Sequence, residues 1–447
     1  MNTPIDAGDT AWVLISAALV LLMTTPALAL FYGGMTRTKN TLNMMMMSFS
    51  ALAGVGVLWV LFGYSAAFGN SLGGLGLLGN PLEAAGLRGL MDKNAVAGTV
   101  PALAFVAFQA AFAVIAVALI SGAVADRMKF SAWIVFSLVW ASIVYFPVAH
   151  WVFAFTSADG TVVGGWIANQ LKAIDFAGGT AIHINAGAAG LALAIVLGKR
   201  QGFGRTPIRP GNLVSVMLGS ALLFVGWFGF NAGSALGANW IAATAFVNTL
   251  AATAAAIIGW LVVERIRDGH ATSLGAASGV VAGLVGITPA AHSVSPVGAL
   301  LLGVGVGALC ALAVPLKFRL GYDDALDVVG VHLVGGFVGT VLIGLLADPT
   351  SPAGVAGLFY GGGFGQLGRQ FIGAMAVLVF SFVLSFLIAI VIKKMMGIRV
   401  DEETERVGID IVTHAEQAYD FTAPAGGSPM HVGHGSAAGT TDKEHLS

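Results

Sequence analysis

Charge is what this 447-residue sequence has least of, because Lys, Arg, Asp and Glu together make up only 10% of it. A soluble domain carries about 25% charged residues, so a water-soluble globular protein is excluded. Hydrophobic residues make up 57% of the chain and predict an all-α polytopic membrane protein. The single cysteine, Cys310, excludes an intrachain disulfide framework. No Lys or Arg precedes Arg37, which argues against a cleaved signal peptide.

Apolar runs of bilayer length recur along the chain and predict eleven transmembrane helices. They cover about residues 10–34, 41–68, 99–124, 130–150, 175–198, 211–231, 239–262, 270–290, 296–316, 325–347 and 368–396. Most basic residues fall at alternate ends of these runs, and the opposite ends hold only Arg88, Lys93, Lys172 and Arg369. The positive-inside rule therefore predicts a multi-pass protein of the cell (inner) membrane, with its N-terminus outside and its C-terminus inside.

Two stretches, DFAGGTAIH (175–183) and DALDVVGVH (324–332), each place an acid eight residues before a histidine. Eight helical residues span about 12 Å, so each acid is expected near a helix end and each histidine well inside. The fifth and tenth spans run in opposite directions, which predicts an inverted repeat of about residues 10–198 and 211–347. Ionisable groups at this depth usually face a cavity or a partner, so His183 and His332 are expected to converge near the midplane.

The rest of the domain plan follows from the last span and the change in composition beyond it. Residues 1–397 are expected to form one transmembrane domain, braced by the helix at about 368–396. Residues 398–447 are predicted to be a cytoplasmic tail, of which 398–421 are charged and could fold against the membrane domain. Residues 422–447, rich in Gly, Ala, Ser and Thr, are predicted to be disordered. His431 and His434 in this segment are interpreted as part of a solvated tail.

A histidine pair in a narrow apolar passage cannot hold two positive charges, so at least one imidazole should be neutral. Neutral imidazoles offer one donor and one acceptor each, which suits a small polar molecule or a proton relay. Aromatic residues gather near the expected outer mouth in FQAAF (108–112) and WFGFNAGS (227–234). Such rings attract a small cation by about 0.5–2 kcal/mol each, and a bulky pair could close the passage to water.

Enzyme and metal sites have little support in the sequence. The chain contains no His-Glu-x-x-His motif and no Gly-x-Gly-Asp motif. An acid more than two helical turns from its histidine is a poor arrangement for zinc ligands. The sequence therefore predicts neither an enzyme nor a bound cofactor or metal, and it gives no sign of nucleic-acid binding.

Together these residues resemble the ammonium transporter family (Amt/Mep/Rh), and especially its bacterial Amt branch. The resemblance covers about 400 residues in consistent order. It runs through ALFYGGMTRTKN (29–40), FQAAF (108–112), GAVADRMKFSAW (122–133), DFAGGTAIHINAG (175–187), WFGFNAGSA (227–235), DDALDVVGVHLVGG (323–336) and GIRVDEETERVGID (397–410). Each string alone is weak evidence for the resemblance, but the whole set in this order is strong evidence.

The resemblance implies a role for each matching position of the pore. His183 and His332 resemble the paired pore histidines that relay protons or coordinate ammonia. Trp227 would line the pore beside them. Phe112 and Phe230 resemble the stacked pair that gates the outer end.

The resemblance also implies an outer ammonium-recruitment site. Ser234 resembles its hydroxyl group, and Phe108 is assigned to it from FQAAF. Asp175 matches the acid that organises this site through surrounding groups, while Asp324 is its inverted counterpart, and both could also cap helices.

The chain departs from the family pattern at the tryptophan of the outer site. PVAH (147–150) is followed by Trp151, Val152 and Phe153, and then by a longer loop that reaches Trp166. Phe153 is the best candidate for the missing ring, with Trp151 or Trp166 as alternatives if the loop folds back. A phenylalanine would bind a cation less well than a tryptophan.

The predicted function is therefore an ammonium/ammonia transporter. The chain is expected to recruit NH4+ outside, to deprotonate it, and to pass NH3 with or without the proton. The alternatives are an Rh-like neutral gas channel and an ammonium sensor that signals through its tail. The resemblance also implies a homotrimer, methylammonium as a substrate analogue, and a possible PII-type signal protein at the cytoplasmic face.

Overall fold

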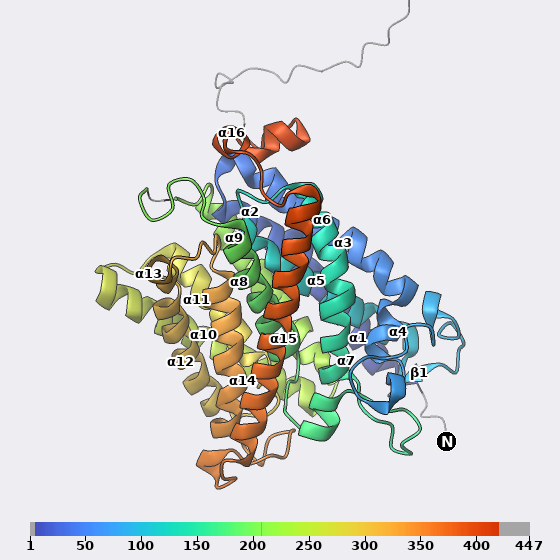
Figure 1. Ribbon diagram of the computed structural model, residues 1–447. Coiled ribbons are helices and arrows are strands. Elements are labelled where there is room, and N and C mark those ends of the chain that lie inside the picture. The colour runs from blue at the N-terminus through green and yellow to red at the C-terminus, as the bar shows by residue number, and fades with distance from the viewer. Residues whose placement is uncertain (1–4, 207, 420–447) are drawn as a thin grey trace, which may run out of the picture.

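The computed structural model describes residues 5–206 and 208–419, and helices dominate both ranges (Figure 1). Ten helical spans in these ranges are long and apolar enough to cross a membrane. Some spans contain two labelled helices joined by a short distorted turn. The first five spans are Ala7–Met35 (α1, Ala7–Leu22; α2, Ala29–Met35), Thr38–Phe68 (α3, Thr41–Leu58; α4, Tyr64–Phe68), Ala102–Val124 (α5), Phe130–Phe153 (α6, Phe130–Trp140; α7, Phe146–Phe153) and Gly179–Leu197 (ending in α8, Asn185–Leu197).

Some of the second five spans also contain two labelled helices. The five spans are Leu213–Ala235 (with α9, Leu213–Asn231), Trp240–Asp268 (α10), Pro296–Leu320 (α12, Pro296–Ala313; α13, Leu316–Leu320), Val329–Leu346 (ending in α14, Val334–Leu346) and Gly365–Met396 (α15). Two very short strands, β1 (Val96–Ala97) and β2 (Val100–Pro101), form an antiparallel hairpin in the connection between the second and third spans. A last short helix, α16 (Glu402–Val407), follows α15.

The predicted span at about 270–290 is α11 (Ser273–Ile287), which has 15 residues. At 1.5 Å per residue it is about 22 Å long, short of the roughly 30 Å of a hydrocarbon core. The helix begins at a Thr272 side chain that accepts a hydrogen bond from the Gly275 N–H, and it ends just before Pro289, which cannot continue it. The predicted count of eleven spans is therefore not confirmed, although the all-α membrane architecture is.

The first span is broken at Pro26. A proline removes one helical hydrogen bond and disfavours the helical conformation of the residue before it. Accordingly Thr25 has φ −132° and ψ 89°, and the chain changes direction between α1 and α2. Met23 and Leu28, on the two sides of this break, both line the central cavity described below.

The two histidine-bearing helices cross inside the bundle, and glycines let their backbones approach. A Cβ on Gly187 would lie 2.5 Å from the backbone nitrogen of Leu333. A Cβ on Gly336 would lie 3.0 Å from the Cβ of His183. Each glycine stands four residues after the histidine of its own helix, on the same face. This mutual arrangement brings residues 183 and 332 together.

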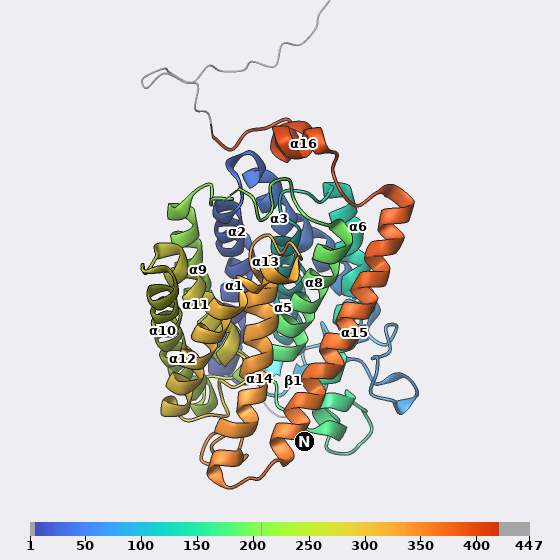
Figure 2. The ribbon, with the colours of Figure 1, turned by 60° about the vertical axis from the view of Figure 1, so that its left-hand side comes forward.

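Helix α15 slants across one side of the bundle, next to α8 and α14 (Figures 1 and 2). The Ser381 hydroxyl on α15 donates to the Asn185 carbonyl oxygen at 2.7 Å, and Trp140 Nε1 donates to Ser385 Oγ at 2.9 Å. Helix α15 is therefore tied to both α8 and α6.

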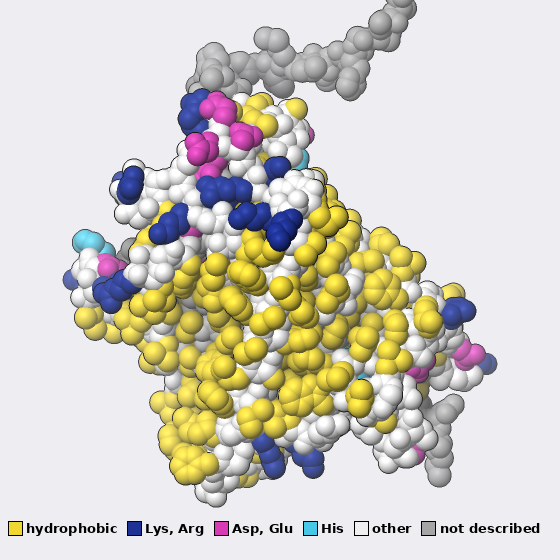
Figure 3. Space-filling model, viewed as in Figure 1, with side chains coloured by type: hydrophobic (Ala, Val, Ile, Leu, Met, Phe, Trp, Pro, Cys, Tyr) yellow, Lys and Arg dark blue, Asp and Glu magenta, His cyan; other side chains and the backbone are white. Residues whose placement is uncertain are grey.

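The side of the molecule seen in Figure 3 is largely apolar, and basic side chains gather near the end where α16 lies. At this end Asp126 accepts hydrogen bonds from Thr36 (2.6 Å) and forms ion pairs with Arg37 (3.0 Å) and Arg200 (3.2 Å). Arg200 also pairs with Asp323 at 2.8 Å. Burial alone would raise the pKa of Asp126, but the two guanidinium groups outweigh it and hold that pKa below its ordinary value.

Residues 398–419 of the tail lie on this same end of the bundle (Figure 2). The Asp410 carboxylate accepts from the backbone N–H groups of Leu42 (2.9 Å) and Asn43 (2.7 Å), at the start of α3. Glu405 accepts from the Gln201 N–H at 2.7 Å. Burial raises the pKa of Asp410. The segment predicted to be disordered, 422–447, and its histidines lie outside the described residues.

Candidate functional site: a histidine-lined pathway

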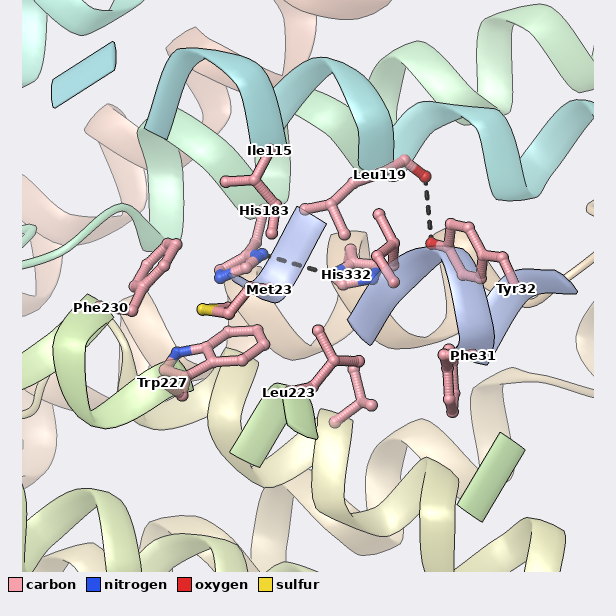
Figure 4. Close-up of a pocket in the computed structure, with 12 residues that line it drawn as sticks. Met23, Phe31, Tyr32, Ile115, Leu119, His183, Leu223, Trp227, Phe230 and His332 are labelled. Carbon is pink, nitrogen blue, oxygen red and sulfur yellow. Dashed lines mark hydrogen bonds between the residues drawn. The ribbon is translucent and has the colours of Figure 1, made fainter. Parts of the chain in front are cut away.

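His183 and His332 form the centre of the site, and both side chains are buried. Their Nδ1 atoms are 3.3 Å apart, and their rings are nearly parallel, with centroids 5.3 Å apart (Figure 4). Each ring comes from one of the two crossing helices. The two histidines therefore meet inside the bundle, as their positions in the sequence predicted.

The pair faces a narrow cavity. The other lining side chains come from five further helical segments and are apolar or aromatic (Figure 4): Met23, Leu28, Phe31, Tyr32, Ile115, Leu119, Leu223, Trp227, Phe230 and Val281. Among the described residues, His183 Nε2 is buried and has no hydrogen-bond partner. A buried ring nitrogen of this kind can accept from or donate to a small polar molecule in the cavity.

Trp227 stacks on His183, with ring centroids 5.4 Å apart and an interplanar angle of 20°. Its Nε1 donates to Thr288 Oγ1 at 2.9 Å, which satisfies the indole N–H. Thr288 had no assigned role in the sequence. The hydrogen bond fixes the plane of Trp227 along the cavity wall.

Phe112 and Phe230 stand between the central cavity and a second hollow on the outer side. Their ring centroids are 4.4 Å apart, and both rings are buried. Phe230 lines the central cavity, whereas Phe112 lines the outer hollow. The stacked pair therefore separates the two spaces.

The outer hollow is lined by Ser234 and by several aromatic rings, and its lining contains no charged side chain. Phe153 lies on this wall, while Trp151 does not. The Trp151 indole instead donates to the Leu77 carbonyl oxygen at 2.8 Å and packs against Trp166. Neither Trp151 nor Trp166 therefore lines the outer hollow.

Phe108 lies behind the wall instead of on it. The residue is fully buried, and its ring makes an edge contact with Phe112 at 4.8 Å. It is one helical turn from Phe112 and faces the neighbouring helices, where its Cε2 would meet a Cβ on Gly233 at 2.9 Å. The structure therefore places Phe108 beside the Phe112 ring, and its assignment to the recruitment site stays a prediction.

Ser234 donates its hydroxyl hydrogen to the Phe230 carbonyl oxygen at 2.8 Å, one turn back. Its oxygen lone pairs stay free to accept from a donor in the hollow. An ammonium ion has only donors, so this hydroxyl has the right polarity for it.

Asp175 lies just before the His183 helix, not inside it, because the helix begins at Gly179. Its carboxylate accepts from the backbone N–H groups of Gly178 (2.8 Å), Gly179 (2.6 Å), Thr180 (2.7 Å) and Ala181 (3.1 Å), and also from the Thr180 hydroxyl. A carboxylate with this many donors is a helix cap. Asp175 therefore fixes the start of the helix that carries His183.

Asp324 caps the other histidine helix in the same way. It accepts from Val328 (3.1 Å) and Val329 (2.7 Å), while Lys317 donates to its backbone oxygen at 2.8 Å. Burial raises the pKa of Asp324 to about 6. The two acids have matching positions in the two helices, as their spacing predicted.

A third hollow opens on the end where the tail lies. Met35, Leu274 and Leu326 line it. Met35 is one helical turn beyond Phe31 and Tyr32, which line the central cavity. The central cavity and the third hollow are therefore bordered by successive turns of the same helix.

Several lining residues carried no assignment from the sequence. On the outer wall these are Tyr64, Phe68, Phe105, Gln109, Phe155 and Phe176. Tyr32 and Phe176 stand inside the quoted motifs ALFYGG and DFAGG, and this was the available signal. Gln109 likewise stands inside the quoted motif FQAAF (108–112). The remaining aromatic residues stand in stretches where the sequence does not distinguish a ring in the wall from one in lipid.

A bundle of membrane-spanning helices with hollows at both ends and a buried histidine pair between them is typical of a membrane transporter. A sequence profile described as the Ammonium Transporter Family matches residues 11–419, and the chain belongs to that family. It is thus a transporter and not an enzyme, in a multi-pass membrane setting.

Individual relatives agree with this assignment. The chain is 61% identical to a protein named "Ammonium transporter" from Mycobacterium tuberculosis (strain ATCC 25618 / H37Rv), over 95% of this chain and 93% of that protein. It is 48% identical to the "Ammonium transporter" of Bacillus subtilis (strain 168), over 92% and 98%. The crystal structure of Saccharomyces cerevisiae Mep2 matches with a TM-score of 0.80 and 33% identity, over 90% and 89%. A structure titled "Sensor Amt Protein" matches with a TM-score of 0.83 and 27% identity, over 91% and 98%.

Proposed function

We propose that this chain recruits NH4+ in the outer hollow, separates it from one proton there, and passes NH3 through the histidine-lined cavity to the cytoplasmic side. The observation that carries the proposal is the 3.3 Å contact between the Nδ1 atoms of His183 and His332 in an otherwise apolar cavity.

The energetics favour ammonia over ammonium in the cavity. A bare cation in a low-dielectric passage costs of order 20 kcal/mol in the idealised limit. Aromatic rings offer about 0.5–2 kcal/mol each, which can hold a cation at the mouth but cannot carry it through. Neutral NH3 avoids this cost. The proton that NH4+ releases either returns to the outer water or crosses separately, and NH3 takes up a proton again on the inner side.

The histidine contact also sets the hydrogen-bonding pattern in the cavity. When one neutral imidazole donates from Nδ1 to the other, its own Nε2 becomes an acceptor. The second ring then carries its hydrogen on Nε2 and becomes a donor. The pair therefore presents one acceptor and one donor, and this matches ammonia, which has three N–H donors and one lone pair. The pattern reverses when the shared hydrogen moves to the second ring while the first ring takes up a proton at its Nε2 and the second releases the proton from its own Nε2. This coupled transfer gives the pair the property of a proton relay.

The outer roles are part of the same proposal. Ser234 and Phe153 recruit the cation, Phe112 and Phe230 gate the passage, and Asp175 holds the His183 helix in place. A homotrimer, methylammonium as an analogue and a PII-type partner at the cytoplasmic face are further expectations of the proposal.

The test uses the protein in liposomes, with an ammonium pulse and simultaneous recording of current and of methylammonium uptake. We expect wild-type protein to take up methylammonium, and we expect the double variant His183→Ala with His332→Ala to lose most flux or its selectivity against other cations. Unchanged flux and selectivity in the double variant would show that the pair has no part in conduction. Currentless, voltage-independent flux in the wild type would favour a neutral gas channel.

A second candidate function is sensing. It is favoured by the tail contacts at Asp410 and Glu405 and by the likeness to the structure titled "Sensor Amt Protein". Uptake measurements separate the two functions, because a protein that only senses ammonium would show none.

A further inference from the structure

Phe176 has a position in the outer hollow that the proposed mechanism does not use. It directly follows the cap residue Asp175, and its ring is one of the walls of the hollow that also contains Phe112, Phe153 and Ser234. Its backbone N–H donates to the Pro289 carbonyl oxygen at 3.1 Å. The ring is therefore attached to the turn that follows α11.

One face of the Phe176 ring is covered by the imidazole of His292, in that same turn. The ring centroids are 4.1 Å apart, and the interplanar angle is 15°. Such a face-to-face contact fixes the plane of Phe176. Because the imidazole covers one face, only the opposite face and the edge of the ring remain to border the hollow.

His292 does not put a positive charge against this ring at neutral pH. Burial lowers its pKa to about 4, and its Nδ1 is buried without a hydrogen-bond partner among the described residues. A protonated imidazole would occupy the π-system of Phe176 and repel another cation. A neutral one leaves the negative potential of the open face available to a small cation.

We propose that Phe176 is a further cation-recognition ring of the outer recruitment site and that His292 is the positioning residue that holds it. This inference rests on the proposed recruitment of ammonium in the outer hollow. An ammonium ion there meets Phe153, Phe112 and Phe176 as ring faces or edges, with the Ser234 oxygen as acceptor. Recognition by Phe176 acts before the gate, so it affects how well the cation is captured and not how fast ammonia crosses.

The experiment measures methylammonium transport in liposomes and separates KM from kcat. Phe176→Leu removes the π-face and is expected to raise KM about 3- to 10-fold, with kcat changed less than about 2-fold. His292→Gly removes the support and is expected to raise KM in the same direction. His292→Phe restores a stacking ring and is expected to keep KM near the wild-type value. Phe359→Leu, at a 70% exposed phenylalanine outside the hollow, is the matched control.

Three outcomes overturn the inference. The first is a KM for Phe176→Leu equal to that of the control. The second is a loss confined to kcat, which a merely structural role would produce. The third is a His292→Phe protein that behaves like His292→Gly. If Phe176→Leu does not fold, the comparison of the two His292 variants decides alone.

An unchanged KM in the Phe176 and His292 variants, together with a raised KM in Ser234→Ala, would reject the role of Phe176 and leave the proposed function intact. Absence of any wild-type flux would instead reject the proposed function.

Discussion

Gly336 is packed so closely against His183 that a Cβ on the glycine would lie 3.0 Å from the histidine Cβ. The reciprocal glycine, Gly187, meets Leu333, the neighbour of His332, in the same way. The two histidines are thus in contact because the backbones of their helices touch, and the imidazoles alone do not determine the distance.

Replacing Gly336 by valine should therefore disrupt the pathway without altering any pore side chain. The added side chain must displace the backbone near Gly179 and His183, and a misplacement of about 1 Å can cost about 100-fold in a process that depends on geometry. We expect methylammonium flux to fall about 10- to 100-fold. Gly305→Val is the control, because a Cβ at Gly305 meets nothing within 4 Å. Equal flux in both variants would mean that the close crossing is not needed.

Phe153 offers a gain-of-affinity prediction. It lies on the outer wall in the absence of a tryptophan, and tryptophan is the strongest cation-binding ring. Phe153→Trp should lower KM for methylammonium about 2- to 5-fold with little change in kcat. The measurement is uptake against substrate concentration, with Phe359→Trp as the control. A raised KM would indicate that the larger ring obstructs the hollow.

The contact between the two histidines was predictable because it depends on short sequence patterns and on ionisable groups that are costly to bury in a membrane. Two histidines buried in apolar spans, each preceded by an acid at the same spacing, have few explanations other than a shared polar site. The helix caps also followed from the sequence, since an acid just before an apolar helix accepts hydrogen bonds from the free backbone N–H groups at the helix start. The contact between His183 and His332 therefore agrees with what the spacing predicted.

The outer wall was less predictable because aromatic residues serve many purposes in a membrane protein. Phe108 and Phe112 are one turn apart in the same motif, yet only Phe112 reaches the hollow, since the neighbouring helices decide which ring is covered. Phe176 and His292 are 116 positions apart in the numbering and meet only through the turn after α11. Hydropathy alone does not register where a helix is capped, so the sequence could not give the 15-residue length of α11.

Asp175 should prove to be a stabilising cap. Asp175→Ala removes the acceptor of four backbone N–H groups and one hydroxyl, and we expect a loss of about 1–3 kcal/mol of stability together with reduced transport. Asp175→Asn keeps one acceptor oxygen and should lose less of both. Thermal unfolding in detergent and uptake in liposomes measure the two effects. Normal stability with lost transport in the alanine variant would instead indicate a direct role in conduction.

The buried ion pairs of Asp126 predict a stability effect that depends on pH. Asp126→Asn removes the carboxylate that Arg37 pairs with and leaves Arg200 with Asp323 as its remaining counter-charge. Losing one partner of a buried pair typically costs about 3–5 kcal/mol. The folded protein holds the pKa of Asp126 below its ordinary value, so the stabilisation is complete above the unfolded pKa of about 3.9 and is lost as the pH falls through the lowered pKa. The difference in thermal stability between wild type and variant should therefore stay constant from neutral pH down to about 4 and shrink below it.

Asp268→Asn is the matched control for this comparison. Asp268 pairs with Arg267 on the surface, where both side chains are more than one-third exposed, and exposed pairs contribute at most about 1 kcal/mol. Scanning fluorimetry of the three proteins across the acid range measures the prediction. If the Asp126 variant lost no more stability than the control at neutral pH, other groups would balance the charges of Arg37 and Arg200. Asp126 would then not be the residue that joins these loops.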